Sequence, residues 1–244
     1  MSISGMVFPR DVACIDAGSE CVLLQSVDVA AGIGDRFHDS LIAPARDVAY
    51  FVARAAAVEI VSLGIVIRSF AIGVSRPLAE MAEVFDGVKL LTAELGAESA
   101  IVASGENYFS AVNSSITISA IGYGRASQLI NRRIKPGDFA YLLGEGYPGK
   151  ALRVGAPDVL PIGQLTKHLS RRSLRQVVPV GSRGVQYDLN EIVDCFGVTL
   201  GDPDDLWRRP GGPGLQFLVV SSEEIADRRL HFIGRFERAK DESA

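Results

Sequence analysis

The feature that most constrains this chain is residues 21–28, an apolar run that leads to an aspartate, Asp28. The run has the length and the side chains of a buried strand. Gly32 and Gly34 follow in a turn that reaches Asp35. A carboxylate beside backbone without side chains is suited to bind a metal ion or a phosphate. Aspartate and glycine are also ordinary turn residues, so a simple turn cap is the alternative.

The composition excludes several classes of protein. The chain has 244 residues, is 48% hydrophobic and carries a net charge of -4, so it has no basic footprint for nucleic acid. Its three cysteines form no CxxC pair, which argues against a disulfide framework or a zinc site and fits a reducing compartment. Residues 48–67 are apolar but include Arg54 and Glu59, and charges are costly inside a bilayer. We therefore expect a cytoplasmic protein without a membrane span.

Apolar patterning predicts the order strand, strand, helix, strand, helix, strand, strand in the first half. The two helices are expected at about residues 44–64 and 77–95, where apolar side chains recur three and four residues apart. This mixture predicts an α+β sandwich in which helices pack on one face of a sheet.

A basic cluster and a tight turn at residues 135–138 mark a boundary, so we expect domains at residues 1–126 and 134–238. In the second domain we expect strands near residues 139–144, 177–180, 215–220 and 231–236. Helices are expected at residues 163–174 and 185–196, with a short one from Glu223. The basic run Arg171, Arg172 and Arg175 is expected on a solvated face.

Four acids of the first half lie at strand ends or on an apolar helix: Asp16, Asp28, Glu59 and Glu106. Mg²⁺ prefers oxygen ligands and is held by carboxylates together with substrate phosphates. If the strands share one sheet, these acids could converge at one edge. A metal site and scattered turn caps are then about equally supported.

Other common motifs are missing. Residues 144–150 resemble the phosphate loop GxxxxGK only superficially, because Ala151 replaces the required Ser or Thr and Pro148 lies inside the loop. No GxGxxG follows a strand into a helix, and neither HExxH nor GxSxG is present.

Five segments resemble, in the right order, the motifs of one superfamily. They are residues 26–28 (S/T-x-D), 57–64 (N-x-S-D-I-x-A-M-G, with Glu59 for the aspartate), 104–107 (G-G-D-T, with Glu106 for the aspartate), 134–144 (K-P-G-D, then apolar residues and glycine) and 181–192 (T-R-G-G, then L-N-E). The superfamily is the PurM-like one of aminoimidazole ribonucleotide synthetase, selenophosphate synthetase, thiamine-monophosphate kinase and the hydrogenase-maturation dehydratase. The resemblance covers nearly the whole chain.

Within this superfamily the chain most resembles the α-ribazole kinase-like members, through residues 28–35 and 179–184. Val180 departs from the aspartate that many relatives have there. The resemblance implies an N-terminal α/β domain whose strands build a dimeric barrel, a C-terminal α+β domain, and the cofactors ATP and Mg²⁺. It implies a homodimer that phosphorylates the 5′-hydroxyl of α-ribazole, a small nucleoside, in salvage of the cobalamin lower ligand.

The resemblance also implies residue roles. Asp28, Glu59 and Glu106, with Asp16, would hold Mg²⁺ on the ATP phosphates, because phosphoryl transfer needs positioning and charge neutralisation. The cofactor would contact Gly32, Gly34, Ser104 and Gly105. The catalytic set would be Asp28, Asp35 and Asn107, with Asp35 or Asn107 orienting the acceptor hydroxyl. The alternatives are thiamine-monophosphate kinase, an ATP-dependent cyclase or dehydratase that activates an amide, and a non-catalytic paralogue.

Overall fold

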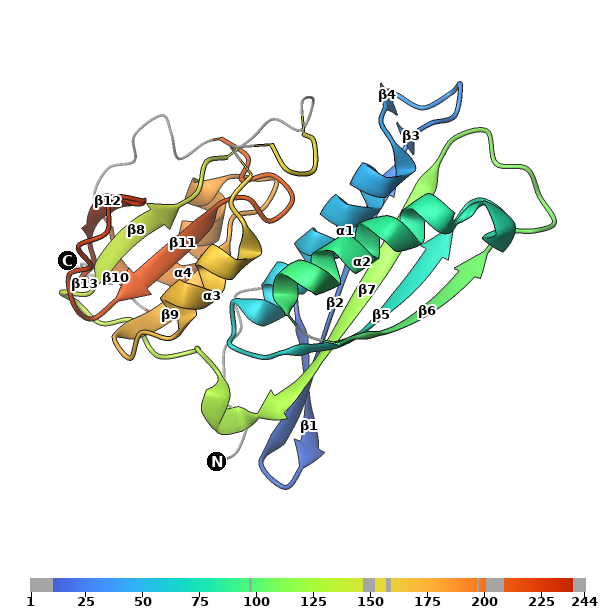
Figure 1. The fold of residues 1–244 in the computed structure, drawn as a ribbon. Coiled ribbons are helices and arrows are strands. Elements are labelled where there is room, and N and C mark those ends of the chain that lie inside the picture. Colours follow the sequence, from blue (N-terminus) through green and yellow to red (C-terminus); the bar gives the residue numbers. More distant parts are fainter. Residues whose placement is uncertain are drawn as a thin grey trace.

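The computed structural model describes residues 11–96, 98–146, 152–156, 159–196, 198–200 and 209–238. These form two large sheets joined by a linker, and two further pairs of short strands (Figure 1). The end of the loop that superficially resembles a phosphate loop lies outside the described residues. The N-terminal sheet has the order β1-β2-β7-β5-β6. Its strands are β1 (Ala13–Gly18), β2 (Cys21–Ala31), β5 (Ile67–Val74), β6 (Ala100–Gly105) and β7 (Ser115–Arg125). The pair β5–β6 is parallel, whereas β1–β2, β2–β7 and β7–β5 are antiparallel.

Two helices cover one face of the N-terminal sheet: α1 (Ala45–Val61) and α2 (Ala82–Leu95). Pro44 precedes α1, and Gly64 lies just beyond it with a φ of 82°, a conformation that glycine adopts without strain. The short strands β3 (Ile33–Gly34) and β4 (Leu41–Ile42) pair with each other. A single 3-10 turn (Leu78–Glu80) precedes α2, and another (Ala126–Gln128) follows β7. The predicted order of elements in the first half is confirmed, except that the two-residue strands β3 and β4 were not predicted.

The C-terminal sheet has the order β12-β8-β11-β9, and all its neighbouring strands are antiparallel. Its strands are β8 (Phe139–Leu143), β9 (Leu174–Pro179), β11 (Phe217–Ser221) and β12 (Leu230–Arg235). The helices are α3 (Ile162–Leu169) and α4 (Val185–Phe196), and β10 (Val198–Thr199) pairs with β13 (Glu237–Arg238).

Two of the helices expected in the second half differ from the prediction, and the short strands β10 and β13 were not predicted. The helix expected at residues 163–174 ends at Leu169, because the chain turns at Arg171, whose N–H donates to the carbonyl of His168, and enters β9. The short helix expected from Glu223 is wrong, since the residues between β11 and β12 form bends and a turn.

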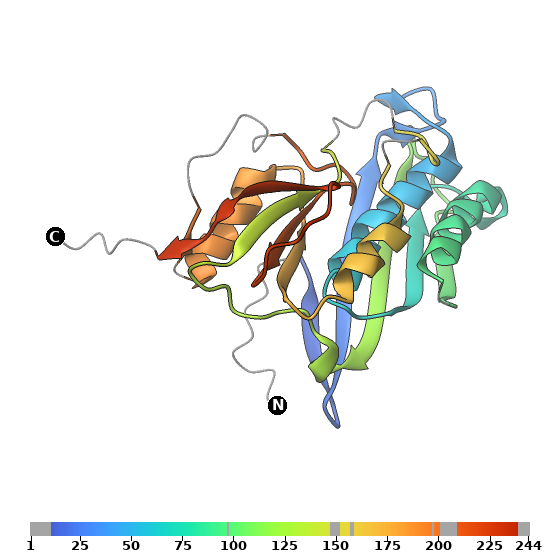
Figure 2. The same ribbon diagram turned by 60° about the vertical axis from the view of Figure 1, so that its left-hand side comes forward.

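The C-terminal sheet is buried on both faces. Tyr141, Phe217 and Val219 join the large core that contains α1, whereas alternate residues such as Leu142 and Leu218 pack with α4 in a second core. Figure 2 shows this sheet between α4 on one side and α1 with α3 on the other. The seam between the two sheets is therefore a continuous apolar core, and the predicted α+β fold is confirmed.

The other face of the N-terminal sheet is open. Its exposed side chains include Ile15, Val27, Val29, Val102 and Tyr123, with exposed fractions from 44% for Tyr123 to 65% for Val102. No helix among the described residues is long and apolar enough to cross a membrane.

Candidate functional site

A cavity of about 640 Å³ lies on the seam between the two sheets. Residues of β2 and α1 form one wall, and the loops around Gly181 and Gly214 form the other. Among its described lining residues are four acids, Asp11, Asp28, Asp47 and Glu59, and one base, Arg153. We call it the acidic cavity, because its carboxylates outnumber its single guanidinium and favour a cationic ligand or group.

Asp28 faces this cavity because successive side chains of β2 point to opposite faces of the sheet. Val22, Leu24 and Ser26 point to the helix-covered face, and Asp28 continues that series two residues on. The strand does not end at Asp28, because its partner β7 continues the pairing as far as Ala31. Burial raises the pKa of Asp28, so its ionised form gains from a cation beside it.

The helix α1 supplies the other two carboxylates of this wall. Asp47 lies in its first turn, is buried, and pairs with the Arg46 guanidinium at 3.2 Å. Glu59 lies in its last turn and is half-buried. The Ser26 hydroxyl donates to the carbonyl of Ala56 at 2.6 Å, which ties β2 to α1 between Asp28 and Glu59.

Arg54 fixes the opposite wall. This side chain is 0% exposed, and its Nε donates to the carbonyl of Gly214 at 3.0 Å. It also donates to the carbonyl of Leu160 and to the Tyr50 hydroxyl. Gly214 has a φ of 68°, and a Cβ there would lie 2.9 Å from Val58 Cγ2, so glycine is required at this approach of loop to helix.

Asp188 shapes the neighbouring loop. Its Oδ2 accepts a hydrogen bond of 2.9 Å from the Gly181 N–H, and burial raises its pKa to about 6. The prediction from sequence missed Asp188, Arg54 and Arg153. The available signal for Asp188 was an acid in the first turn of a helix that follows a glycine turn.

Asp16 and Glu106 do not reach the acidic cavity. Asp16 pairs with Val22 at the hairpin end of β2, about 20 Å along the strand from Asp28, and its Oδ1 caps the turn by accepting from the Gly18 N–H. Asp28 and Glu106 lie toward the same end of the strands of the N-terminal sheet, but β7 and β5 separate β2 from β6 by about 14 Å.

The expected convergence of four acids is therefore wrong within one chain. Among the described residues no group of three or more His, Cys, Asp or Glu side chains is placed to hold a metal ion. The Glu106 carboxylate instead accepts from the N–H groups of Tyr108 and Phe109, which lowers its pKa.

The remaining predicted residues lie in loops and strand ends outside this cavity. Asp35 forms an ion pair with Arg76, and hydrogen bonding to that guanidinium lowers the pKa of Asp35. The Gly32 N–H donates to the carbonyl of Ser114 at 2.8 Å, and a Cβ on Gly34 would overlap the Ser114 side chain. Local hydrogen bonding and packing therefore explain glycine at these two positions without a ligand.

Ser104 and Gly105 form the end of β6, and the Asn107 amide donates to the carbonyl of Gly105 at 3.0 Å. Their predicted contacts with a cofactor or acceptor stay predictions.

Comparison with known proteins identifies the fold. No family model and no curated protein matches the sequence. Among solved structures, thiamine monophosphate kinase from Aquifex aeolicus superposes with a TM-score of 0.68 at 15% identity, covering 94% of this chain and 89% of that one. AaThiL complexed with AMPPCP and TMP gives 0.69 at 15% identity, covering 96% and 86%.

Two further solved structures share the fold. Thermotoga maritima PurL complexed with ADP gives a TM-score of 0.69 at 12% identity, covering 95% of this chain and 42% of that one. The HypE-HypF complex gives 0.63 at 15% identity, covering 94% and 88%. At such identities the likeness concerns the fold alone. The chain has the fold of the PurM-like superfamily that the five motifs indicated.

Proposed function

We propose that the acidic cavity binds ATP with Mg²⁺ and that the chain transfers the γ-phosphoryl group to a hydroxyl of a small nucleoside-like molecule. The observation that carries this proposal is the partly desolvated carboxylate of Asp28 in a cavity that also contains Glu59. The fold supports it, because neighbours in the fold were solved with AMPPCP and with ADP.

The residues present fit a magnesium ion. Mg²⁺ is usually held by one or two carboxylates, substrate phosphates and water, so Asp28 and Glu59 suffice as protein ligands. A cation there would stabilise the ionised carboxylate of Asp28 and so offset the effect of burial, which raises its pKa. When bound, the ion would neutralise charge on the phosphates. Asp16 and Glu106 are not needed in this form of the proposal.

Arg153 is the group on the opposite side that suits the phosphates. It is the single base among the described residues that line the acidic cavity. Among the described residues, its guanidinium donates to the carbonyl of the preceding Leu152 alone, at 2.8 Å, which leaves further donors for a ligand. We assign it the role of binding a phosphate oxygen. The roles of Asp35 and Asn107 toward the acceptor hydroxyl remain part of the proposal.

We further propose that the chain forms a homodimer through the open face of the N-terminal sheet. The exposed side chains of Val27, Val29 and Val102 would be removed from water in such a dimer, which favours association. The proposed acceptor is α-ribazole, which places the activity in salvage of the cobalamin lower ligand. The proposal divides the chain into the domains 1–126 and 134–238.

The test is incubation with ATP, Mg²⁺ and a panel of nucleosides and thiamine phosphates, followed by mass spectrometry. A kinase adds the mass of a phosphoryl group to one acceptor, whereas a cyclase or dehydratase releases inorganic phosphate. Asp28→Asn is expected to abolish transfer while the circular dichroism spectrum is retained. Asp16→Asn, at the distant hairpin turn, is the matched control and should retain wild-type turnover. Normal turnover in Asp28→Asn would refute the site.

A further inference from the structure

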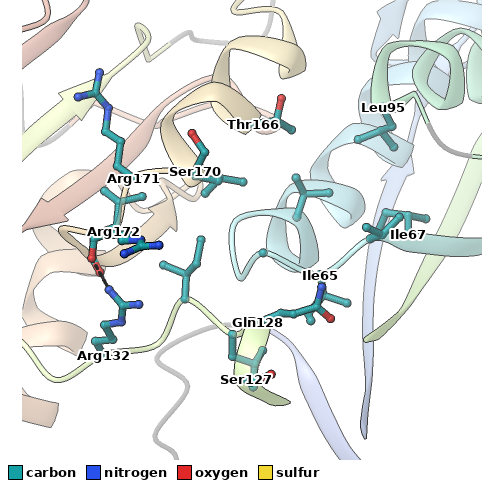
Figure 3. Close-up of a pocket in the computed structure, with 17 residues that line it drawn as sticks. Ile65, Ile67, Leu95, Ser127, Gln128, Arg132, Thr166, Ser170, Arg171 and Arg172 are labelled. Carbon is teal, nitrogen blue, oxygen red and sulfur yellow. Dashed lines mark hydrogen bonds between the residues drawn. The ribbon is translucent and has the colours of Figure 1, made fainter. Parts of the chain in front are cut away.

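A second cavity, of about 440 Å³, lies on the same seam at and beyond the C-terminal end of α1 (Figure 3). It is built from the segment after α1, the linker after β7, and the end of α3 with the turn that follows it. We call it the linker pocket. Figure 3 shows Ile65, Ile67 and Leu95 on one side and Thr166 and Ser170 on the other. Both sheets therefore contribute to it, and its walls are largely aliphatic.

The charge of the linker pocket is opposite to that of the acidic cavity. Its described lining residues include three arginines, Arg132, Arg171 and Arg172, and no Asp or Glu. The chain as a whole has a net charge of -4, so an acid-free group of three arginines is a local departure from its composition. The structure joins two basic runs that lie far apart in the sequence. Arg171 and Arg172 are exposed, as predicted, but they lie in the turn after α3 rather than on a helix, and they border this cavity.

The three arginines are held to different degrees. Arg132 Nη1 donates to the carbonyls of Arg172 and Leu174, the latter at 3.2 Å, which fixes its position. Arg171 lies 3.9 Å from the Asp227 carboxylate, which Arg229 approaches more closely, at 2.9 Å. The Arg172 guanidinium forms no hydrogen bond or ion pair with any residue that the structure describes. Its donors are therefore available to a ligand.

We propose that the linker pocket binds a small phosphate ester with an apolar ring. The guanidinium groups of Arg132 and Arg172 would hold the phosphate, because a guanidinium presents paired donors that match phosphate oxygens. The ring would lie on the aliphatic side chains of Ile65 and Leu129. The volume falls within the range of small-molecule sites, which combine apolar walls with a few polar groups. The site is independent of the proposed phosphotransfer.

Because the ligand contacts both sheets, its binding should also stabilise the folded chain. A ligand that binds only the native state raises the free energy of unfolding by RT ln(1 + [L]/Kd), so the midpoint of thermal unfolding rises with the ligand concentration. This effect gives a second readout besides direct binding.

The test uses 1-naphthyl phosphate as the probe and isothermal titration calorimetry with the full chain. We expect saturable binding with one site per chain, and a higher unfolding midpoint at saturation. Arg172→Gln should weaken binding about tenfold, the effect of losing one charge-assisted contact. Arg238→Gln, an exposed arginine on β13, is the matched control and should bind as the wild type does. Inorganic phosphate and 1-naphthol should each bind far more weakly.

A second variant tests the space rather than the charge. Thr166→Trp places an indole at the rim of the linker pocket, on an exposed position of α3, and should abolish binding with an unchanged circular dichroism spectrum. Three results would overturn the proposal: no binding of 1-naphthyl phosphate at millimolar concentration, equal affinity in Arg172→Gln and the wild type, or binding that survives Thr166→Trp. Displacement of the probe by Mg-ATP together with survival in Thr166→Trp would place it in the acidic cavity.

Discussion

Replacing Arg54 by methionine should be among the most destabilising single changes on the seam. Methionine has a similar length and fits an apolar site, so the change removes the charge and the donors rather than the volume. Two carbonyl groups, of Gly214 and Leu160, lose their donor, as does the Tyr50 hydroxyl. Glu94, whose Oε2 lies 3.9 Å from Arg54 Nη1, loses its cation.

The magnitude follows from the two carbonyl contacts. Hydrogen bonds from a charged donor contribute roughly 1.5–3 kcal/mol each, and removing one partner of a buried charge network costs about 3–5 kcal/mol. We therefore expect Arg54→Met to lower the free energy of unfolding by about 4 kcal/mol. For a chain of this size that corresponds to a fall of about 10 °C in the unfolding midpoint. Arg54→Lys keeps the charge but not the planar fork, so it should lose about half as much.

Urea denaturation followed by circular dichroism and by tyrosine fluorescence measures the effect. Arg68→Met, an exposed arginine of β5, is the control and should stay within about 0.5 kcal/mol of the wild type. Coincident transitions of the two probes would justify the two-state free energy. If Arg54→Met lost less than about 1 kcal/mol, the Arg54 contacts would not hold the seam, and the reasoning from buried charge would fail.

Three further predictions concern particular side chains. Gly87→Ala should lower the free energy of unfolding by about 2–3 kcal/mol, because the added Cβ overlaps the carbonyl of Arg46 where α2 meets α1. Gly163→Ala in α3, where the Cβ meets open space, should raise it by about 0.5 kcal/mol. Thermal unfolding of the two variants compares these effects. Since the pKa of Asp188 is raised to about 6, the stability that its protonated form contributes is present below about pH 4 and is lost as pH rises through 6. Between pH 4 and 7 the free energy of unfolding of the wild type should therefore fall by about 1 kcal/mol more than that of Asp188→Asn, a figure that allows for solvent screening. A pH series of urea curves that runs parallel for the two proteins would contradict this. Arg153→Gln should raise the KM for ATP about tenfold with a smaller effect on kcat, and an unchanged KM would remove Arg153 from the phosphate site.

The elements that local pattern determines could be predicted from the sequence. The spacing of apolar residues placed α1 and α2 within a few residues, and the glycines near their ends marked where they stop. Asp28 and Glu59, two of the predicted metal ligands, line one cavity, because one lies on the covered face of β2 and the other on the helix that covers it. Their roles stay predictions. The positions of the helices depend on neighbours along the chain, and the nearness of Asp28 and Glu59 depends on the packing of one helix on one strand.

What could not be predicted depends on the order of strands. The strand β7, last of the first half in sequence, lies between β2 and β5, and this insertion separates Glu106 from Asp28. The end of β2 could not be predicted for the same reason, since it depends on the pairing with β7, which continues past Asp28. Arg54 was interpreted only as a charge that excludes a membrane span. Its actual contacts are with Leu160 and Gly214, more than a hundred positions away, and no local pattern indicates them.

The helix α1 connects the two cavities physically. Asp47 and Glu59 on this helix line the acidic cavity, Val61 at its end lines the linker pocket, and Arg54 between them ties the helix to the C-terminal sheet. Each cavity has walls from both sheets, so each has its shape only when the seam is closed. The apolar core that closes the seam is continuous, and packed cores of this kind shift between discrete arrangements rather than deform smoothly. The geometry of the seam therefore governs both cavities at once, and Arg54 is the buried polar group that fixes it.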